Sequence, residues 1–499
     1  MIHPKYSDSV NPAAVGTPNN TTVYELPIYE RINEFWGSTD GDADNVIGDN
    51  TEWVADVIWQ DINARAIHFT DETGSADQDV FNGKGKKPVY FKLNRETLSS
   101  GMNIYGNILV GVKKKEASVY LWSWHLWVTD YNPDVAPVPS QVTSNTANYS
   151  GFNYLYVQNK SVTGPGIMDL QGAFLATTNS ATSYTENVFD GNVQHYSQTA
   201  TAQWSDASKA VWDGTGIYAN KWIMDRNLGA QSTSCADVKD PLDGWGMYYQ
   251  FGRKDPFTYK DTYTINGSTK HSAKWSVASI GSKNTVGTIK EGILHPNLFY
   301  PIKDSSGAKW AEGATSNAWF NPNWYTAGNS KGAKTLFDPC PPGWCIPSID
   351  AFDFASLSTE ANNMLAIYIN SNSAITTINV PKRNFAFLVN KSSAATLYTT
   401  FPLQGIIKGE TGTIHNVATS ANSLTATGGI ATIRGCVWGR EYIDSDGASG
   451  KLVQIQPAGT QYSVPDRRGR AYAKYELGWY IKSWITARGQ NVRCIQIPD

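Results

Sequence analysis

The chain has 499 residues, with 41 lysine and arginine side chains against 44 aspartate and glutamate side chains and a formal net charge of -3. This near balance excludes a general electrostatic attraction to nucleic acid or to an anionic membrane. Charged residues make up only 17% and aromatic residues 12%, and 43 glycines and 23 prolines punctuate the chain. This composition excludes disorder throughout and is typical of turn-rich β proteins, here with roughly two to four domains.

Residues 1–22 are rich in proline, asparagine, serine and threonine and show no periodicity, which predicts a flexible leader. No apolar run approaches the roughly 18 residues that cross a bilayer, so we expect a soluble chain. The N-terminal residues lack a basic segment followed by an apolar one. Two alternatives follow: a cytosolic protein, or a secreted protein whose leader is absent.

Short β-branched and aromatic runs, separated by segments rich in glycine, asparagine and aspartate, dominate residues 23–135. This spacing predicts an antiparallel β-sandwich domain with strands at 53–62, 64–71, 87–94, 106–113 and 117–130. The last run is apolar at both alternating sets of positions, so we expect that strand to be central or covered by a neighbouring domain. A structural role is favoured for His125 within it. We also expect this domain to fold independently and not to bind ligand.

Three prolines between residues 131 and 141 mark the end of the first domain. Residues 136–209 are rich in serine, threonine, asparagine and alanine, and we assign them to a linker or an insertion. Residues 210–499 form the last predicted domain. Its best helical candidate is 347–368, which has a serine near its start and acidic residues in its first turn. The predicted fold is mainly β with a minor α+β part.

Sequence motifs for catalysis, nucleotide binding and metal binding are missing. The seven histidines are scattered without HExxH spacing, and neither GxSxG nor a phosphate-binding glycine motif occurs. The five cysteines include no CxxC pair of zinc type. The run 444–450 loosely resembles a calcium loop but lacks the closing glutamate, so a tight turn is favoured there. We therefore predict that the protein is not an enzyme and uses no cofactor or metal.

Tryptophan, tyrosine and arginine crowd into two segments near the C-terminus, 437–442 and 467–484. These residue types are enriched in binding hot spots because they supply contact area and hydrogen bonds at modest entropic cost. Between Asp466 and Arg493 there are seven basic and two acidic side chains. The segments predict a positive, aromatic binding face; the alternative is a solvated face with aromatic core residues beneath it.

Five segments carry a resemblance to known proteins: 121–134, 221–230, 246–257, 337–348 and 491–495. The last four, in this order, resemble the C-type-lectin-like module at the C-terminus of secreted Bacteroidetes proteins, including fimbrillin-type pilus tip adhesins and the Fibrobacter-type paralogous domain. The first resembles the end of the β domain that commonly precedes it. The same fold occurs in formylglycine-generating enzymes and in variable proteins of diversity-generating retroelements. The signatures of calcium-dependent sugar binding, EPN, QPD and WND, do not occur here.

The resemblance implies an exported adhesin on a cell surface or pilus tip, whose lectin-like head binds a protein or glycan on a host, bacterial or phage surface. Pilus subunits are the other implied partners. It places a ligand-binding face, which a retroelement could diversify, on the two C-terminal segments. The residues of this face are Trp438, Arg440, Tyr442, Arg468, Arg470, Tyr472, Tyr475, Trp479, Tyr480, Lys482 and Trp484. Alternatives are a structural pilin subunit, or an oxidase or hydrolase on a scaffold like that of formylglycine-generating enzymes.

The cysteines take their expected roles from the same resemblance. Cys340 lies in a proline-rich turn and Cys494 in the last predicted strand, and we predict a disulfide between them. Such a bond would require export to an oxidising compartment. Cys345 and Cys436, which depart from the usual pattern of the module, are candidates for a second bridge. Cys235 would then be the odd thiol.

Overall fold

The computed structural model describes residues 23–37, 43–62, 65–93, 106–129, 140–142, 155–159, 167–169, 202–204, 209–211, 222–224, 226–230, 244–258, 263–265, 268–271, 275–279, 287–302, 310–312, 320–321, 333–349, 363–369, 384–388, 398–402, 404–415, 434–443, 449–465 and 471–497. Along 442–443, 449, 455–465, 471–484 and several short strands, it describes the backbone without the side chains. The described part is mostly β with antiparallel sheets, as predicted. None of its helices is long and apolar enough to cross a membrane.

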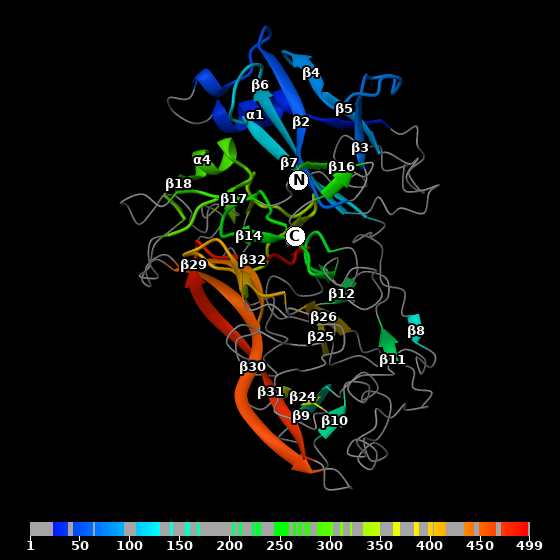
Figure 1. The fold of residues 1–499 in the computed structure, drawn as a ribbon, viewed down its shortest axis with the longest axis vertical. Coiled ribbons are helices and arrows are strands. Elements are labelled where there is room, and N and C mark those ends of the chain that lie inside the picture. The colour runs from blue at the N-terminus through cyan, green and yellow to red at the C-terminus, as the bar shows by residue number, and fades with distance from the viewer. Residues whose placement is uncertain are drawn as a thin grey trace.

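The described residues between 23 and 129, which we call the N-terminal sandwich, contain a three-stranded sheet, β1-β5-β3, a four-stranded sheet, β4-β2-β6-β7, and a helix (Figure 1). The five strands predicted here are present, and β1, β4 and the helix were not predicted. The elements are β1 (Tyr24–Leu26), α1 (Ile28–Trp36), the short 3-10 helix η2 (Ala43–Asn45), β2 (Glu52–Gln60), β3 (Ile67–Thr70), β4 (Phe81–Lys84), β5 (Val89–Leu93), β6 (Gly106–Lys114) and β7 (Trp122–Val128).

Helix α1 covers one side of the sandwich core. Its residues Ile28, Ile32, Phe35 and Trp36 are buried, which is the i, i+4, i+7, i+8 spacing of one helical face. The Trp36 indole nitrogen donates a hydrogen bond of 2.8 Å to the carbonyl oxygen of Leu121, just before β7. The helix therefore fixes the start of β7 as well as filling the core.

The sandwich core is completed by residues from much later in the chain. Ile293 belongs to the same buried cluster, and Leu336 and Phe337 pack against it. The rings of Phe35 and Phe337 meet edge to face, with centroids 5.6 Å apart. The core is therefore shared with the C-terminal unit, by which we mean the described residues from 209 onward.

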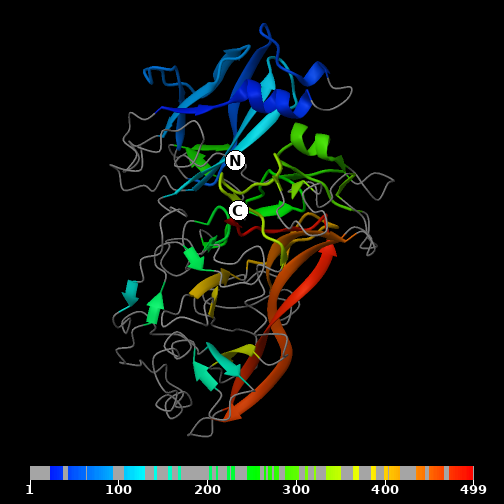
Figure 2. The ribbon, with the colours of Figure 1, turned by 180° about the vertical axis from the view of Figure 1, so that it is seen from behind.

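The largest sheet has ten strands in the order β10-β9-β24-β31-β30-β29-β32-β27-β28, with β14 paired to β32, and all but β9 and β10 belong to the C-terminal unit. Figures 1 and 2 both show its two longest strands as a twisted ribbon that runs away from the N-terminal sandwich. Its strands are β9 (Leu155–Asn159), β10 (Ile167–Asp169), β14 (Tyr248–Gln250), β24 (Asn363–Ile369), β27 (Ile406–Ile407), β28 (Ile414–His415), β29 (Gly435–Ile443), β30 (Ser449–Pro465), β31 (Ala471–Ile485) and β32 (Gly489–Asn491).

A four-stranded sheet of order β12-β13-β33-β23 joins the start of the C-terminal unit to its end. The remaining described strands form two-stranded sheets. The strands of the four-stranded and two-stranded sheets, together with helix α4, are β8 (Ser140–Val142), β11 (Ala202–Trp204), β12 (Lys209–Val211), β13 (Trp222–Met224), β15 (Tyr263–Ile265), β16 (Ser268–His271), β17 (Ser276–Val277), β18 (Gly287–Thr288), α4 (Ile289–Leu294), β19 (Leu298–Phe299), β20 (Ala311–Glu312), β21 (Phe320–Asn321), β22 (Ala333–Lys334), β23 (Trp344–Cys345), β25 (Asn384–Leu388), β26 (Tyr398–Pro402) and β33 (Ile495–Gln496).

The helix predicted over 347–368 is wrong where the structure describes it. Asn363–Ile369 forms strand β24, which pairs with β31 on one side and with β9 on the other. The run NMLAIYI contains β-branched and aromatic residues that suit a strand with two neighbours, and this pairing outweighs the capping signals upstream. Residues 350–362 lie outside the described residues. Strand β9 comes from the stretch assigned to a linker or insertion, so that stretch contributes to the main sheet; the predicted leader is not described.

Candidate functional site

The two aromatic and basic segments of the sequence lie on adjacent strands of one sheet. Strand β29 pairs with β30, and β30 pairs with β31, both antiparallel. The register aligns Tyr442 with Gly450 and Gly450 with Trp484, so these three positions form one row across the sheet. The tertiary structure therefore brings together two segments that the sequence separates.

Trp438 and Arg440 are buried, at 0% and 3% exposure, so their placement on an exposed ligand face is wrong. The Trp438 indole nitrogen donates a 2.9 Å hydrogen bond to the carbonyl oxygen of Tyr249, and its ring packs edge to face with that of Phe251 at 5.5 Å. The backbone nitrogen of Arg440 donates to the carbonyl oxygen of Pro347. Strand β29 is thus held against the core, and the alternative of aromatic core residues holds here.

The base of the ribbon formed by β30 and β31 is also embedded. Position 482 pairs with Leu452, which is fully buried, and position 484 pairs with Gly450. A Cβ atom added at Gly450 would lie 2.5 Å from the Phe251 ring, so the sheet packs closely on the core at this row. The positions of Lys482 and Trp484 therefore belong to the embedded base.

The distal part of β31, by which we mean Ala471 to Tyr480, carries the remaining described positions of the predicted ligand face. These positions are divided between the two faces of the sheet. Because successive residues of a strand lie on opposite faces, Tyr472 and Tyr480 share one face and Tyr475 and Trp479 share the other. Strand β24 pairs with β31 without interruption from Ala473 to Leu477, which keeps this alternation regular. The predicted positions therefore cannot all lie on a single face. Arg468, Arg470 and residues 444–448 of the calcium-like run lie outside the described residues.

A row of three residues that sequence analysis missed crosses the distal part of the sheet. Lys474 is aligned with Tyr368 of β24 on one side and with Tyr462 of β30 on the other. This row belongs to the face of Tyr472. The signal was absent from the sequence because Tyr368 is more than 100 positions from Lys474 along the chain and becomes its neighbour only through strand pairing.

The predicted disulfide between Cys340 and Cys494 is present, with Cα atoms 5.8 Å apart and a sequence separation of 154 residues. The predicted second bridge is wrong, because Cys345 and Cys436 are both free, buried thiols. Burial raises the pKa of the Cys436 thiol to about 12 and raises that of Cys345 as well. Neither thiol therefore has the low pKa of a reactive cysteine. Cys235 lies outside the described residues.

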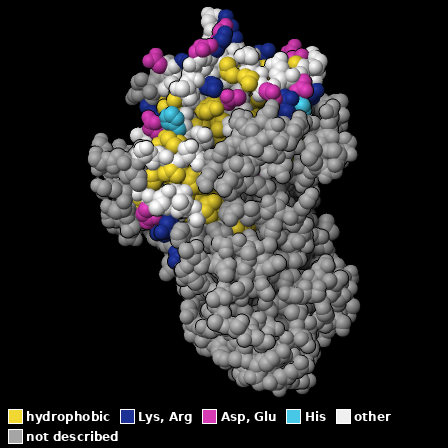
Figure 3. All heavy atoms as spheres, in the orientation of Figure 1, with side chains coloured by type: hydrophobic (Ala, Val, Ile, Leu, Met, Phe, Trp, Pro, Cys, Tyr) yellow, Lys and Arg dark blue, Asp and Glu magenta, His cyan; other side chains and the backbone are white. Residues whose placement is uncertain are grey.

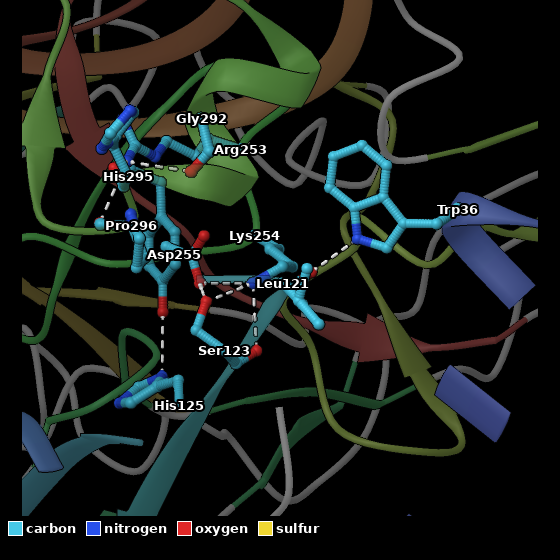
Figure 4. A network of polar contacts seen from close by, with 11 residues as sticks. Trp36, Leu121, Ser123, His125, Arg253, Lys254, Asp255, Gly292, His295 and Pro296 are labelled. Carbon is cyan, nitrogen blue, oxygen red and sulfur yellow. Dashed lines mark hydrogen bonds and ion pairs between the residues drawn. The ribbon is translucent and has the colours of Figure 1, made fainter. Parts of the chain in front are cut away.

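A buried polar junction joins the N-terminal sandwich to the C-terminal unit (Figure 4). The Lys254 ammonium donates to the hydroxyl and the carbonyl oxygen of Ser123, at 2.6 and 3.0 Å, and pairs with the Asp255 carboxylate at 2.6 Å. The Ser123 hydroxyl donates to the same carboxylate at 2.6 Å. Because Ser123 lies in β7, this group explains why the strand is buried on both faces although it stands at the edge of its sheet.

The spacing of Ser123 and Lys254 resembles that of a nucleophile and its base. Burial lowers the pKa of Lys254 to about 8, which would favour such a base. However, the adjacent Asp255 carboxylate favours the charged ammonium, and Ser123 is only 1% exposed. We therefore interpret the group as a structural ion pair.

The neighbouring Arg253 ties this junction to the loop after α4. Its guanidinium group is buried and donates to the carbonyl oxygens of His295 and Pro296 at 2.8 and 2.9 Å (Figure 4), and to that of Leu298 at 2.7 Å. It also stacks over the ring of Phe257, 4.8 Å from the centroid. These contacts fix the loop after α4 to the segment that carries Lys254 and Asp255, within the C-terminal unit. The independent folding of the sandwich stays a prediction.

The described surface of the N-terminal sandwich has mixed charge. On the face seen in Figure 3, acidic and basic side chains are interspersed over this part of the molecule. Within the described ranges, no three histidine, cysteine or acidic side chains are grouped so that they could hold a metal ion. Comparisons with protein-family models, curated proteins and solved structures found no match to the chain.

Proposed function

We propose that the protein is a cell-surface or pilus-tip adhesin, with a C-type-lectin-like head that binds its ligand through the distal part of the ribbon formed by β30 and β31. The observation that supports this proposal is the reach of the ribbon. Its strands have 17 and 15 residues, against a mean of about 5–6 residues in globular proteins. The base anchors the ribbon in the core, and the distal strand positions include Tyr472, Lys474, Tyr475 and Trp479.

The residue types of the ribbon suit a protein or glycan ligand that carries acidic groups. Tyrosine and tryptophan offer flat apolar faces together with polar groups, and lysine adds positive charge. Along the two strands Lys451, Lys474 and Lys482 outnumber the single acidic residue, Glu476, in a chain whose overall charge is negative. Such charges mainly accelerate association and make it sensitive to salt.

The disulfide between Cys340 and Cys494 supports the exported location, because such bonds persist in oxidising compartments. The sandwich would attach the head to the cell surface or to other pilus subunits. Under this proposal ligand binding relies on side-chain contacts alone and needs no metal.

The proposal can be tested with the fluorescently labelled full chain, using a printed glycan array and intact bacterial and epithelial cells as probes. Two matched double variants separate the faces of β31: Tyr472→Ala with Tyr480→Ala, and Tyr475→Ala with Trp479→Ala. Loss of a central anchor costs about 2 kcal/mol, or roughly 30-fold in affinity. We expect one variant to lose binding and the other to retain it.

Lys86→Ala, at an exposed position of the sandwich, serves as the control and should bind like the wild type. If both double variants fold and bind every probe like the wild type, the ribbon is not the ligand site. In that case the alternative of a structural pilin subunit is favoured.

A further inference from the structure

His125 lies at the centre of the buried junction, and both nitrogens of its ring are engaged. The side chain is 1% exposed. Its Nε2 lies 2.9 Å from Oδ1 of Asn107 in β6, and its Nδ1 lies 3.3 Å from the hydroxyl of Tyr249 in β14. Figure 4 shows the ring close to the group formed by Ser123 and its partners. The imidazole therefore bridges the N-terminal sandwich and the C-terminal unit.

The neighbours of Asn107 determine which ring nitrogen carries the proton. The side-chain nitrogen of Asn107, Nδ2, donates to Oδ2 of Asp61 and to the carbonyl oxygen of Gly229, both at 2.9 Å. Its Oδ1 is therefore the acceptor that faces His125, so Nε2 of the imidazole must be the donor. Nδ1 then has a free lone pair and accepts from the Tyr249 hydroxyl. The neutral imidazole satisfies every partner.

A second proton on the imidazole would disrupt this arrangement. It would occupy Nδ1, and the Tyr249 hydroxyl would lose its acceptor. The resulting positive charge would be buried, and no carboxylate in the described part of the chain contacts the imidazole. Asp61 lies behind Asn107, Asp255 is paired with Lys254, and Asp338 acts on Tyr249 from the C-terminal unit. Burial accordingly lowers the pKa of His125 to about 3.

We infer that the junction is an acid-labile joint, in which protonation of His125 separates the N-terminal sandwich from the C-terminal unit. His125 and Asn107 belong to the first, and Tyr249 and Gly229 belong to the second. The hydrogen bonds from His125 to Tyr249 and from Asn107 to Gly229 cross the junction, and so does the backbone bond from Tyr120 to Leu294. A charged imidazole needs an acceptor for each of its two N–H groups and solvation of its charge. Water supplies both when the two parts move apart.

The sign of the pH dependence follows from proton binding in the two states. In the separated state His125 is exposed and has its ordinary pKa of about 6.5, whereas in the closed state its pKa is about 3. Below pH 6.5 the separated state therefore binds one more proton. The equilibrium constant for separation rises about tenfold per pH unit down to about pH 3. Lys254 is protonated in both states across this range, so it adds no pH dependence there.

Hydrogen exchange of the full chain, measured by mass spectrometry between pH 7 and pH 4 and corrected for intrinsic rates, tests the joint. The amide of Tyr120 donates to the carbonyl oxygen of Leu294 and reports the junction, whereas the amides of β2 report the fold of the sandwich itself. From pH 6 to pH 4 we expect the protection of Tyr120 to fall about 100-fold while β2 stays protected.

Two variants assign the effect to a single histidine. His125→Gln keeps an amide donor and acceptor but cannot titrate, so its junction should stay protected at pH 4. His295→Gln changes an imidazole with 37% of its side chain exposed at the end of α4 and should respond to acid like the wild type.

An acid response that persists in His125→Gln would overturn the inference, and so would constant protection of Tyr120 in the wild type. If His125→Gln does not fold at pH 7, Tyr249→Phe decides. This variant removes the donor that stabilises the neutral Nδ1, so the onset of separation should move to higher pH. An unchanged onset would overturn the inference.

Discussion

Replacement of Trp438 by alanine tests most directly whether β29 belongs to the core or to a ligand face. The change removes a fully buried indole, and a core tryptophan typically contributes about 3–5 kcal/mol. It also leaves the Tyr249 carbonyl oxygen without this donor, at a cost of about 1 kcal/mol, and removes the ring contact with Phe251. We expect a loss of about 5 kcal/mol, a large part of the stability of an ordinary domain.

The assay is urea unfolding of the oxidised full chain, followed by circular dichroism, with the midpoint and slope compared between variants. Trp438→Phe retains a flat aromatic ring, although a smaller one, and loses the indole donor, so it should lose about half as much stability. The exposed control Lys86→Ala should change stability by about 0.5 kcal/mol or less. An unchanged midpoint in Trp438→Ala would refute the burial argument and return this position to the ligand face.

Three further outcomes are expected. Cys340→Ala should lower the free energy of unfolding by about 4–5 kcal/mol, because the disulfide closes a loop of 154 residues; a melting temperature equal to that of the wild type would contradict this. Asp255→Ala should cost about 3–5 kcal/mol by leaving the Lys254 ammonium unpaired, and Lys254→Met in the same chain should restore part of the loss in the same unfolding assay. Deletion of residues 1–135 should expose Ile293 and Phe337, so we expect the truncated chain to bind a hydrophobic dye; a soluble truncated chain that binds no dye would show that the sandwich is dispensable.

Local patterns in the sequence were sufficient for five of the seven strands of the N-terminal sandwich. Alternation of apolar and polar residues with a period of two needs no knowledge of the partner strand, so the runs around Trp53 and Phe91 could be assigned directly. The mainly β fold follows from the same signals. The pairing of Cys340 with Cys494 was predicted only through the resemblance of their surrounding segments to a known module.

Long-range pairing decided what the local patterns left open. The run Asn363–Ile369 became a strand because β9 and β31 flank it, and Trp438 became a core residue because Phe251 and the Tyr249 carbonyl lie beneath it. The same composition of aromatic and basic residues suits a core or a binding face, so composition could not separate the two. The role of His125 likewise depends on Tyr249, which is 124 positions away in the chain. Sequence periodicity specifies which residues share a face, but only the folded chain determines what that face packs against.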